Sequence, residues 1–196
     1  VVKNGVFFET VIKNITRGAQ IKASVLDEIV SDEPTNMQYL MLANLQDGII
    51  SDELPYLKGI DSKYEKYCIK NGSLVISKNA SPVKMAIVSV QEGNKILANG
   101  NLYVIELDKD KINPYFLKAY LESESGKAAL SRVAVGATLL NLPVEGLKKV
   151  IIPLPDLESQ KKIADQYYAK LSEIKELKYK LEKATEELEH IYTEEK

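Results

Sequence analysis

The C-terminal segment 156–196 constrains the fold of this chain more than any other feature. It contains neither Gly nor Pro, and it follows Pro155, which ends a strand and favours a turn. Asp156 is a suitable helix N-cap, and Glu158 and Asp165 bias negative charge toward the helix start. A helix of about 37 residues would be roughly 55 Å long. Because this exceeds the diameter of a domain of this size, we expect the far end of the helix to project.

The apolar residues of this segment form a narrow stripe along the predicted helix. They are Ile163, Tyr167, Leu171, Ile174, Leu177, Leu181, Ala184, Leu188 and Ile191. From Leu177 onward they follow the 4-3 spacing of a coiled coil, with an irregularity near Ile174. A narrow stripe suits a partner helix better than a broad sheet. We therefore predict a helix-pairing interface formed by Tyr167, Leu171, Ile174, Leu177, Leu181 and Leu188. The alternative is a solvated helix that folds back on its own domain.

The composition is that of a globular protein. Of 196 residues, 45% are hydrophobic and 28% are charged, which is typical of folded domains. No apolar run approaches the ~18 residues needed to span a bilayer, so we expect no membrane association. The N-terminus lacks the layout of a signal peptide, and a single cysteine, Cys68, excludes an internal disulfide framework. These features predict a cytoplasmic protein.

The first 155 residues alternate between predicted strands and short helices. Segments 73–79 and 83–90 predict a hairpin, 100–107 and 147–154 predict further strands, and the Asp47-Gly48 pair predicts a tight turn. Segment 6–15 is expected to form a short amphipathic helix or a helix leading into a strand. Segment 113–134 is expected to be helical, with Asn113 as N-cap, Pro114 at the first helical position and a break at Gly126. We predict an α+β fold with a mixed, mainly antiparallel sheet, followed by the long helix. Residues 1–155 and 156–196 form its two predicted parts.

No catalytic constellation is recognisable. One Cys and one His cannot build the usual Cys/His zinc site, and no phosphate-binding or nucleophile motif is present. We expect neither a metal nor a cofactor. The triplet Asn113-Pro114-Tyr115 resembles part of the Asn-Pro-Pro-aromatic loop of adenine-N6 methyltransferases, but the second proline and a Gly-rich cofactor loop are missing. A methyltransferase active site is therefore disfavoured.

Charge and polar loops point instead to binding. The net charge is −2, and the segment from Asp156 onward carries 8 Lys and 11 Asp or Glu; the first 155 residues therefore hold 18 basic and 17 acidic residues. Any basic surface must be a local patch. Lys and Arg contact phosphates, whereas Asn, Gln and Arg match the hydrogen-bonding edges of bases. The candidate DNA-binding residues lie in polar loops and are Arg17, Gln20, Lys22, Lys78, Asn79, Lys84, Asn99, Arg132 and Thr138. Polar turns also occur for purely structural reasons.

The order of motifs resembles the specificity subunits of type I restriction–modification systems. In that family a recognition domain ends with a small Gly/Ser-Thr loop, a strand ending in Pro-x-Pro, and a Leu-x-x-Gln-x-x-Ile motif that opens a long helix. The matching elements here are Gly136-Ala137-Thr138, Ile151–Pro155, and Leu157, Gln160 and Ile163. The resemblance covers nearly the whole chain and is strongest over the last 60 residues. Ser73 stands where an Asp is usual in the family hairpin, and Ala43 stands where an Arg is frequent.

The resemblance implies a non-catalytic DNA-reading subunit. Such subunits carry two recognition domains and two long helices, which pack antiparallel as a spacer. Each domain reads half of a split target in double-stranded DNA, and the subunit docks methyltransferase subunits and, through them, restriction subunits. With one domain and one helix, this chain resembles half of such a subunit, so a second copy or a second half would pair through the helix. The alternative function is a coiled-coil interaction adaptor without DNA binding; a small enzyme is a third.

Overall fold

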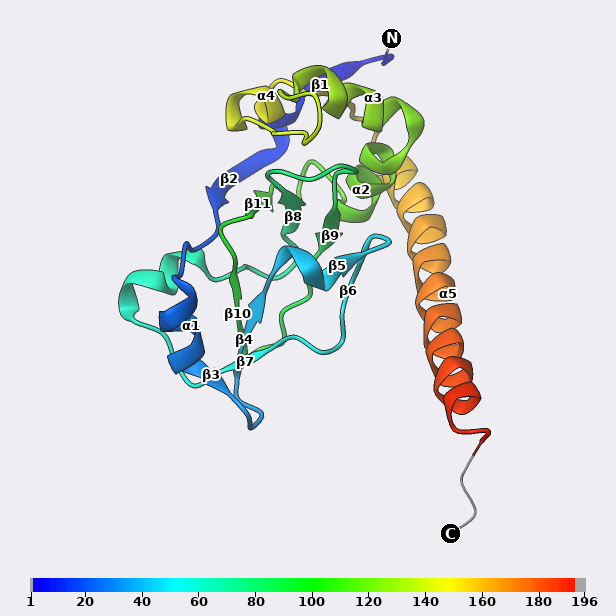
Figure 1. The fold of residues 1–196 in the computed structure, drawn as a ribbon. Coiled ribbons are helices and arrows are strands. Elements are labelled where there is room, and N and C mark those ends of the chain that lie inside the picture. The colour runs from blue at the N-terminus through cyan, green and yellow to red at the C-terminus, as the bar shows by residue number, and fades with distance from the viewer. Residues whose placement is uncertain (1, 193–196) are drawn as a thin grey trace.

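The computed structural model describes residues 2–192 (Figure 1). Four small sheets and short helices form a head, and one long helix runs along its side. The strands are β1 (Gly5–Phe7), β2 (Ile12–Arg17), β3 (Val30–Ser31), β4 (Met37–Leu40), β5 (Leu45–Gln46), β6 (Ile49–Ile50), β7 (Tyr56–Leu57), β8 (Leu74–Ser77), β9 (Met85–Ile87), β10 (Lys95–Ala98), β11 (Leu102–Leu107) and β12 (Ile151–Pro153). The α-helices are α1 (Ala23–Ile29), α2 (Pro114–Glu122), α3 (Glu124–Val133), α4 (Val144–Lys148) and α5 (Leu157–Glu189). Three 3-10 helices are η1 (Phe8–Val11), η2 (Leu42–Asn44) and η3 (Ser62–Tyr67).

The sheet order confirms the predicted mixed, mainly antiparallel α+β fold. One four-stranded sheet has the order β2-β11-β8-β9 and is antiparallel throughout. A second has the order β10-β4-β7-β3, in which only the β10–β4 pair is parallel. Two-stranded sheets pair β1 with β12 and β5 with β6. The β5–β6 hairpin turns at Asp47 and Gly48, both at positive φ, as the Asp-Gly signal predicted.

The central strands β8 and β11 are buried on both faces, because side chains alternate along a strand. Leu74, Ile76 and Ile105 face a core that they share with α2, α3, α4 and β12. Val75 and Val104 face a second core beneath β4, β10 and the β5–β6 hairpin. A third, smaller core lies under α1 and η3 around Tyr39 and Leu57. The β2-β11-β8-β9 sheet therefore lies between the first and second cores, and the β10-β4-β7-β3 sheet lies between the second and third.

Several local predictions need correction. Segment 6–15 does not form an amphipathic α-helix; it forms the end of β1, η1 and the start of β2, which agrees with the other expected form, a short helix leading into a strand. The break in segment 113–134 falls at Ser123, whose hydroxyl caps α3, while Gly126 lies inside α3. A Cβ at Gly126 would come within 2.0 Å of the Tyr120 carbonyl oxygen, so this glycine allows α2 and α3 to approach closely. The last strand starts at Ile151, and α4 occupies residues before it.

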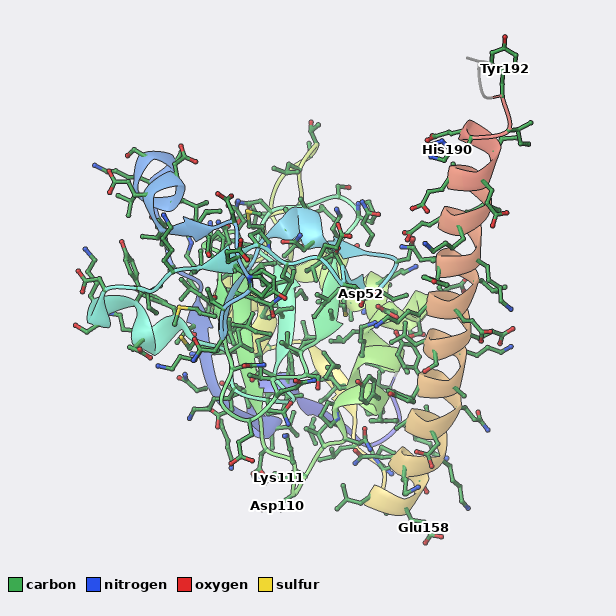
Figure 2. All side chains as sticks on the ribbon, turned by 90° about the horizontal axis from the view of Figure 1, so that it is seen from below. Asp52, Asp110, Lys111, Glu158, His190 and Tyr192 are labelled. Carbon is green, nitrogen blue, oxygen red and sulfur yellow. The ribbon has the colours of Figure 1, made fainter. Side chains whose placement is uncertain are left out.

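The start of the long helix follows the prediction. The Asp156 carboxylate caps α5 by accepting hydrogen bonds from the Ser159 backbone N–H and hydroxyl, both at 2.9 Å. These bonds hold the pKa of Asp156 below its usual value. The helix continues for 33 residues to Glu189, and Figure 2 labels His190 and Tyr192, which follow its far end. Among the described residues, no helix is long and apolar enough to cross a membrane.

Candidate nucleic-acid interface

Four polar segments that are distant in sequence meet at one end of the strands of the β2-β11-β8-β9 sheet. The backbone N–H of Gly100 donates to the Ala19 carbonyl at 2.9 Å, which joins segment 17–22 to segment 99–101. The N–H of Lys78 donates to the Asn101 carbonyl at 2.9 Å, which adds segment 78–84. The N–H of Leu142 donates to the Lys78 carbonyl at 2.9 Å, which adds segment 134–142. We call this set of four segments the loop face.

The loop face carries a concentrated positive charge. Its 25 residues contain four cations and no Asp or Glu, whereas the whole chain has more acidic than basic residues. The cations are Arg17, Lys22, Lys78 and Lys84. A local charge of +4 on a chain of net charge −2 is the kind of patch that attracts phosphates.

Arg17 is held in a defined orientation although it is exposed. Its Nε donates to the Gly100 carbonyl at 2.7 Å, and with the Gln20 amide oriented to satisfy both groups, the amide oxygen accepts from all three guanidinium nitrogens, from Nη2 at 3.0 Å. The neighbouring Gly18 lets the chain pass Asn99, because a Cβ there would lie 2.0 Å from the Asn99 carbonyl oxygen. Nη1 and Nη2 each carry a second N–H, and these donors can bind an acceptor such as a guanine edge or a phosphate.

Asn99 serves the loop face differently from the prediction. Its side-chain N–H₂ donates to the Tyr39 hydroxyl at 2.6 Å, and its side-chain oxygen accepts from the Asn101 backbone N–H at 2.8 Å. Both ends of the amide therefore support the turn, and the exposed Asn101 stands beside it. Burial raises the pKa of Tyr39, so its hydroxyl stays neutral. Tyr39 therefore supports the turn. No local sequence motif could predict this role, because its hydrogen-bond partner Asn99 is 60 residues away.

All but one of the other predicted residues lie on the loop face. Lys22 is exposed at the start of α1, Lys78 and Lys84 are half-buried at the ends of the β8–β9 hairpin, and Thr138 is exposed at the tip of segment 134–142. Asn79 pairs with Asn141 in an isolated antiparallel bridge and thereby ties two segments together. Arg132 lies elsewhere: it is exposed on α3, and its charge acts on Tyr120, whose hydroxyl donates to the Ile151 carbonyl at 3.2 Å. The structure thus brings eight of the nine predicted residues to the loop face.

The first turns of α5 are locked to the head by buried polar groups. Gln160 is fully buried; its side-chain oxygen accepts from the Asn113 N–H at 2.8 Å, and its N–H₂ donates to the carbonyls of Lys111 and Pro155 at 3.1 and 2.8 Å. One helical turn further on, Ala164 is buried against the first core. Figure 2 labels Lys111 near the end of the molecule where α5 begins.

A second polar cluster joins α2 to α5. The ammonium of Lys118, a fully buried residue, donates to the Glu122 carboxylate at 2.7 Å and to the Tyr167 hydroxyl at 2.5 Å; that hydroxyl in turn donates to Glu122. Burial lowers the pKa of Lys118, and burial with the Glu122 charge raises the pKa of Tyr167 far above its ordinary value. Tyr167, which we predicted in the helix-pairing interface, is therefore half-buried against the head.

The remaining predicted pairing residues become steadily more exposed along α5. Leu171 is half-buried and lines a cavity of about 370 Å³ with Ile50 and Tyr115. Beyond it, exposure rises from 41% at Ile174 to 68% at Leu181 and 69% at Leu188. Two ion pairs, Lys175–Asp52 and Lys178–Asp47 at 3.1 Å each, link this part of α5 to the β5–β6 region; Figure 2 labels Asp52 between head and helix. The stripe thus splits into a head-binding half and an exposed half.

Comparisons with solved structures show which known proteins share this fold. The chain matches a structure titled as the basis of complex assembly and conformational transition of the type I R-M system, at 18% identity over 95% of this chain and 43% of that one (TM-score 0.63). It also matches the HsdS subunit of Thermoanaerobacter tengcongensis at 19% identity, over 88% of this chain and 39% of that one (TM-score 0.57). The S subunit of a type I restriction-modification system from M. genitalium matches at 14% identity, over 84% and 38% (TM-score 0.54).

The sequence itself places the chain in a family. Residues 28–187 match the family of type I restriction modification DNA specificity domains, and the chain belongs to this family. The predicted resemblance is thereby confirmed. No match was found among curated proteins. The chain spans about two fifths of the length of the solved chains that it matches.

Proposed function

We propose that this chain is a non-catalytic, sequence-specific DNA recognition module of a type I restriction–modification complex. In this proposal residues 1–155 read one half of a split target and residues 156–196 form the spacer and pairing helix. The observation that carries the proposal is the loop face, where four segments without any acidic residue present fixed polar donors on a chain of overall negative charge. Membership of the DNA specificity domain family supports it.

The exposed half of α5 supports pairing with an equivalent helix. Ile174, Leu177, Leu181 and Leu188 leave apolar surface in water at the spacing of a coiled-coil seam. A second copy would give a two-fold dimer that reads a palindrome with an undefined gap; the second half of a longer chain would give two different half-sites. That the solved chains are more than twice as long as this one agrees with either arrangement.

The proposed partners are double-stranded DNA, the methyltransferase subunits, and restriction subunits through them. No cofactor is needed for reading, and the place of action is the cytoplasm. Four cations on the loop face supply few phosphate contacts, so we expect modest affinity for duplex DNA in isolation and a strong increase when the methyltransferase subunits are added.

A salt-titrated binding assay tests the proposal. With about four phosphate contacts, the observed association constant should fall about 12-fold for each doubling of salt. The assay uses duplexes that carry a site methylated by the complex and duplexes in which that site is scrambled, with and without the methyltransferase subunits. Site preference that appears only with the intact loop face supports DNA reading. Binding to the methyltransferase with no preference for any duplex would favour the adaptor function instead.

A further inference from the structure

Two large apolar side chains stand in water on the otherwise polar loop face. Val135 is 61% exposed and Leu139 is 55% exposed. Among the described residues before α5, no other large apolar residue is more than half exposed. Between them lie Ala137 and Thr138, which also end in methyl groups. The tip of segment 134–142 is therefore a small surface of methyl groups, whereas the seam of α5 is a long stripe.

The tip is held rigidly. Val135 and Asn141 exchange both backbone hydrogen bonds, at 2.8 and 2.9 Å, and so close the loop at its base. The Ala80 N–H donates to the Leu140 carbonyl at 3.2 Å, which fastens the loop to segment 78–84. Gly136 adopts φ +116°, and a Cβ there would lie 2.5 Å from the Leu139 carbonyl oxygen. A loop that is ordered before binding loses little entropy when a ligand covers it.

The surroundings of the tip select its ligand. Lys78 and Asn79 lie on the adjoining segment, and no carboxylate occurs anywhere on the loop face. This setting favours a polyanion that also presents apolar groups. In the major groove of DNA, the apolar group on a base edge is the 5-methyl group of thymine, and short methyl-bearing side chains contact it. The groove is about 12 Å wide and admits an α-helix, so a narrow loop can enter it.

We propose that Leu139, with Val135 and Thr138, reads thymine by contact with its 5-methyl group, while the cations beside the loop hold the phosphates. Leu139 is then a specificity-determining residue of apolar type on a face whose other candidates are polar. This inference rests on the proposed DNA-reading function and assigns part of its chemistry. One methyl group removed from water is worth about 0.8 kcal/mol, so each contacted methyl should change affinity about fourfold.

Replacing thymine by deoxyuridine tests the inference, because deoxyuridine lacks only the 5-methyl group. The target is first located from the positions that the complete complex methylates. Duplexes are then made with each thymine of the half-site replaced in turn, and binding of the full chain with its methyltransferase subunits is measured. Wild type and Leu139→Ala are compared. Leu157→Ala is the matched control, since Leu157 is 48% exposed but lies at the start of α5.

For wild type, we expect deoxyuridine at one or two positions to weaken binding about fourfold. Leu139→Ala should bind the thymine duplex correspondingly less tightly and be indifferent to deoxyuridine at those positions, while Leu157→Ala behaves as wild type. Equal deoxyuridine profiles for wild type and Leu139→Ala would overturn the inference while leaving DNA reading intact. So would a Leu139→Ala protein that binds DNA normally but no longer assembles with the methyltransferase. If wild type prefers no site at all, the DNA-reading function itself fails, and the inference fails with it.

Discussion

The sharpest stability prediction concerns Gln160, which fastens α5 to the head. The change is Gln160→Leu, which keeps the size of the side chain and removes its polar atoms. Three hydrogen bonds of 2.8 to 3.1 Å are lost, and the Asn113 N–H and the carbonyls of Lys111 and Pro155 lose a partner. A lost bond costs about 1 kcal/mol on average, and a buried group left without a partner costs more. Because Lys111 is exposed and Pro155 is half-buried, we count each lost bond at the average cost. We therefore expect a loss of about 3 kcal/mol.

For a protein of this size, a loss of about 3 kcal/mol lowers Tm by roughly 6–12 °C. Urea unfolding followed by circular dichroism gives the free energy of unfolding, and hydrogen exchange in the first turns of α5 shows whether the helix detaches locally. Gln166→Leu is the control, since Gln166 is exposed on the same helix and its replacement should change stability by less than about 0.5 kcal/mol. If Gln160→Leu is no more destabilising than Gln166→Leu, and exchange at the helix start is unchanged, the three hydrogen bonds do not fasten α5.

Three further predictions concern DNA reading, pairing and pH. Arg17→Ala should weaken site-specific DNA binding about 10- to 100-fold, as expected for a lost bidentate contact, while Tm stays within a few degrees; unchanged affinity would remove Arg17 from the reading face. Leu181→Asp should make a paired species monomeric in light scattering, because a charge replaces an apolar residue in the seam, whereas the head retains its circular dichroism spectrum. Asp156 has a depressed pKa in the folded state, so its contribution to stability is present above about pH 4 and is lost as the pH falls further. Asp156→Asn should cap the helix without that loss, so its acid unfolding curve should be flatter than that of wild type; parallel curves would contradict the assignment.

The elements that were predictable from sequence are those fixed by local chemistry. Asn113 and Asp156 accept hydrogen bonds as helix N-caps, and the Asp47-Gly48 turn closes a hairpin, because each needs only neighbouring residues. Gly126 misled the prediction, since its role is to let α3 approach α2, which depends on contacts between helices. Likewise β2 forms a strand because β11 pairs with it from almost 90 residues away.

The candidate site shows the same division. Clusters of Lys, Arg and Asn marked the loops, but only the tertiary hydrogen bonds showed that four of these loops share one face and that Arg132 lies apart. Asn99 looked like a reading residue because its residue type suits base edges; its bond to Tyr39 shows a supporting role. The 4-3 spacing of apolar residues in α5 could not show which of them contact the head and which remain exposed. Tyr167 continues the apolar spacing, yet its hydroxyl bonds to Lys118 and Glu122.

The head contacts α5 from its start as far as the ion pair of Lys178 with Asp47, so only the last turns of the helix can move without breaking these contacts. From Lys178 to Glu189 the helix extends about 17 Å past its last ion pair with the head. A tilt of about 12° in this part would displace the tip by about 3.4 Å, which is the rise of one base pair along a DNA strand. The range of tilt that the contacts between α5 and the head allow, more than the length of α5, would then determine how much the distance between two DNA half-sites can vary.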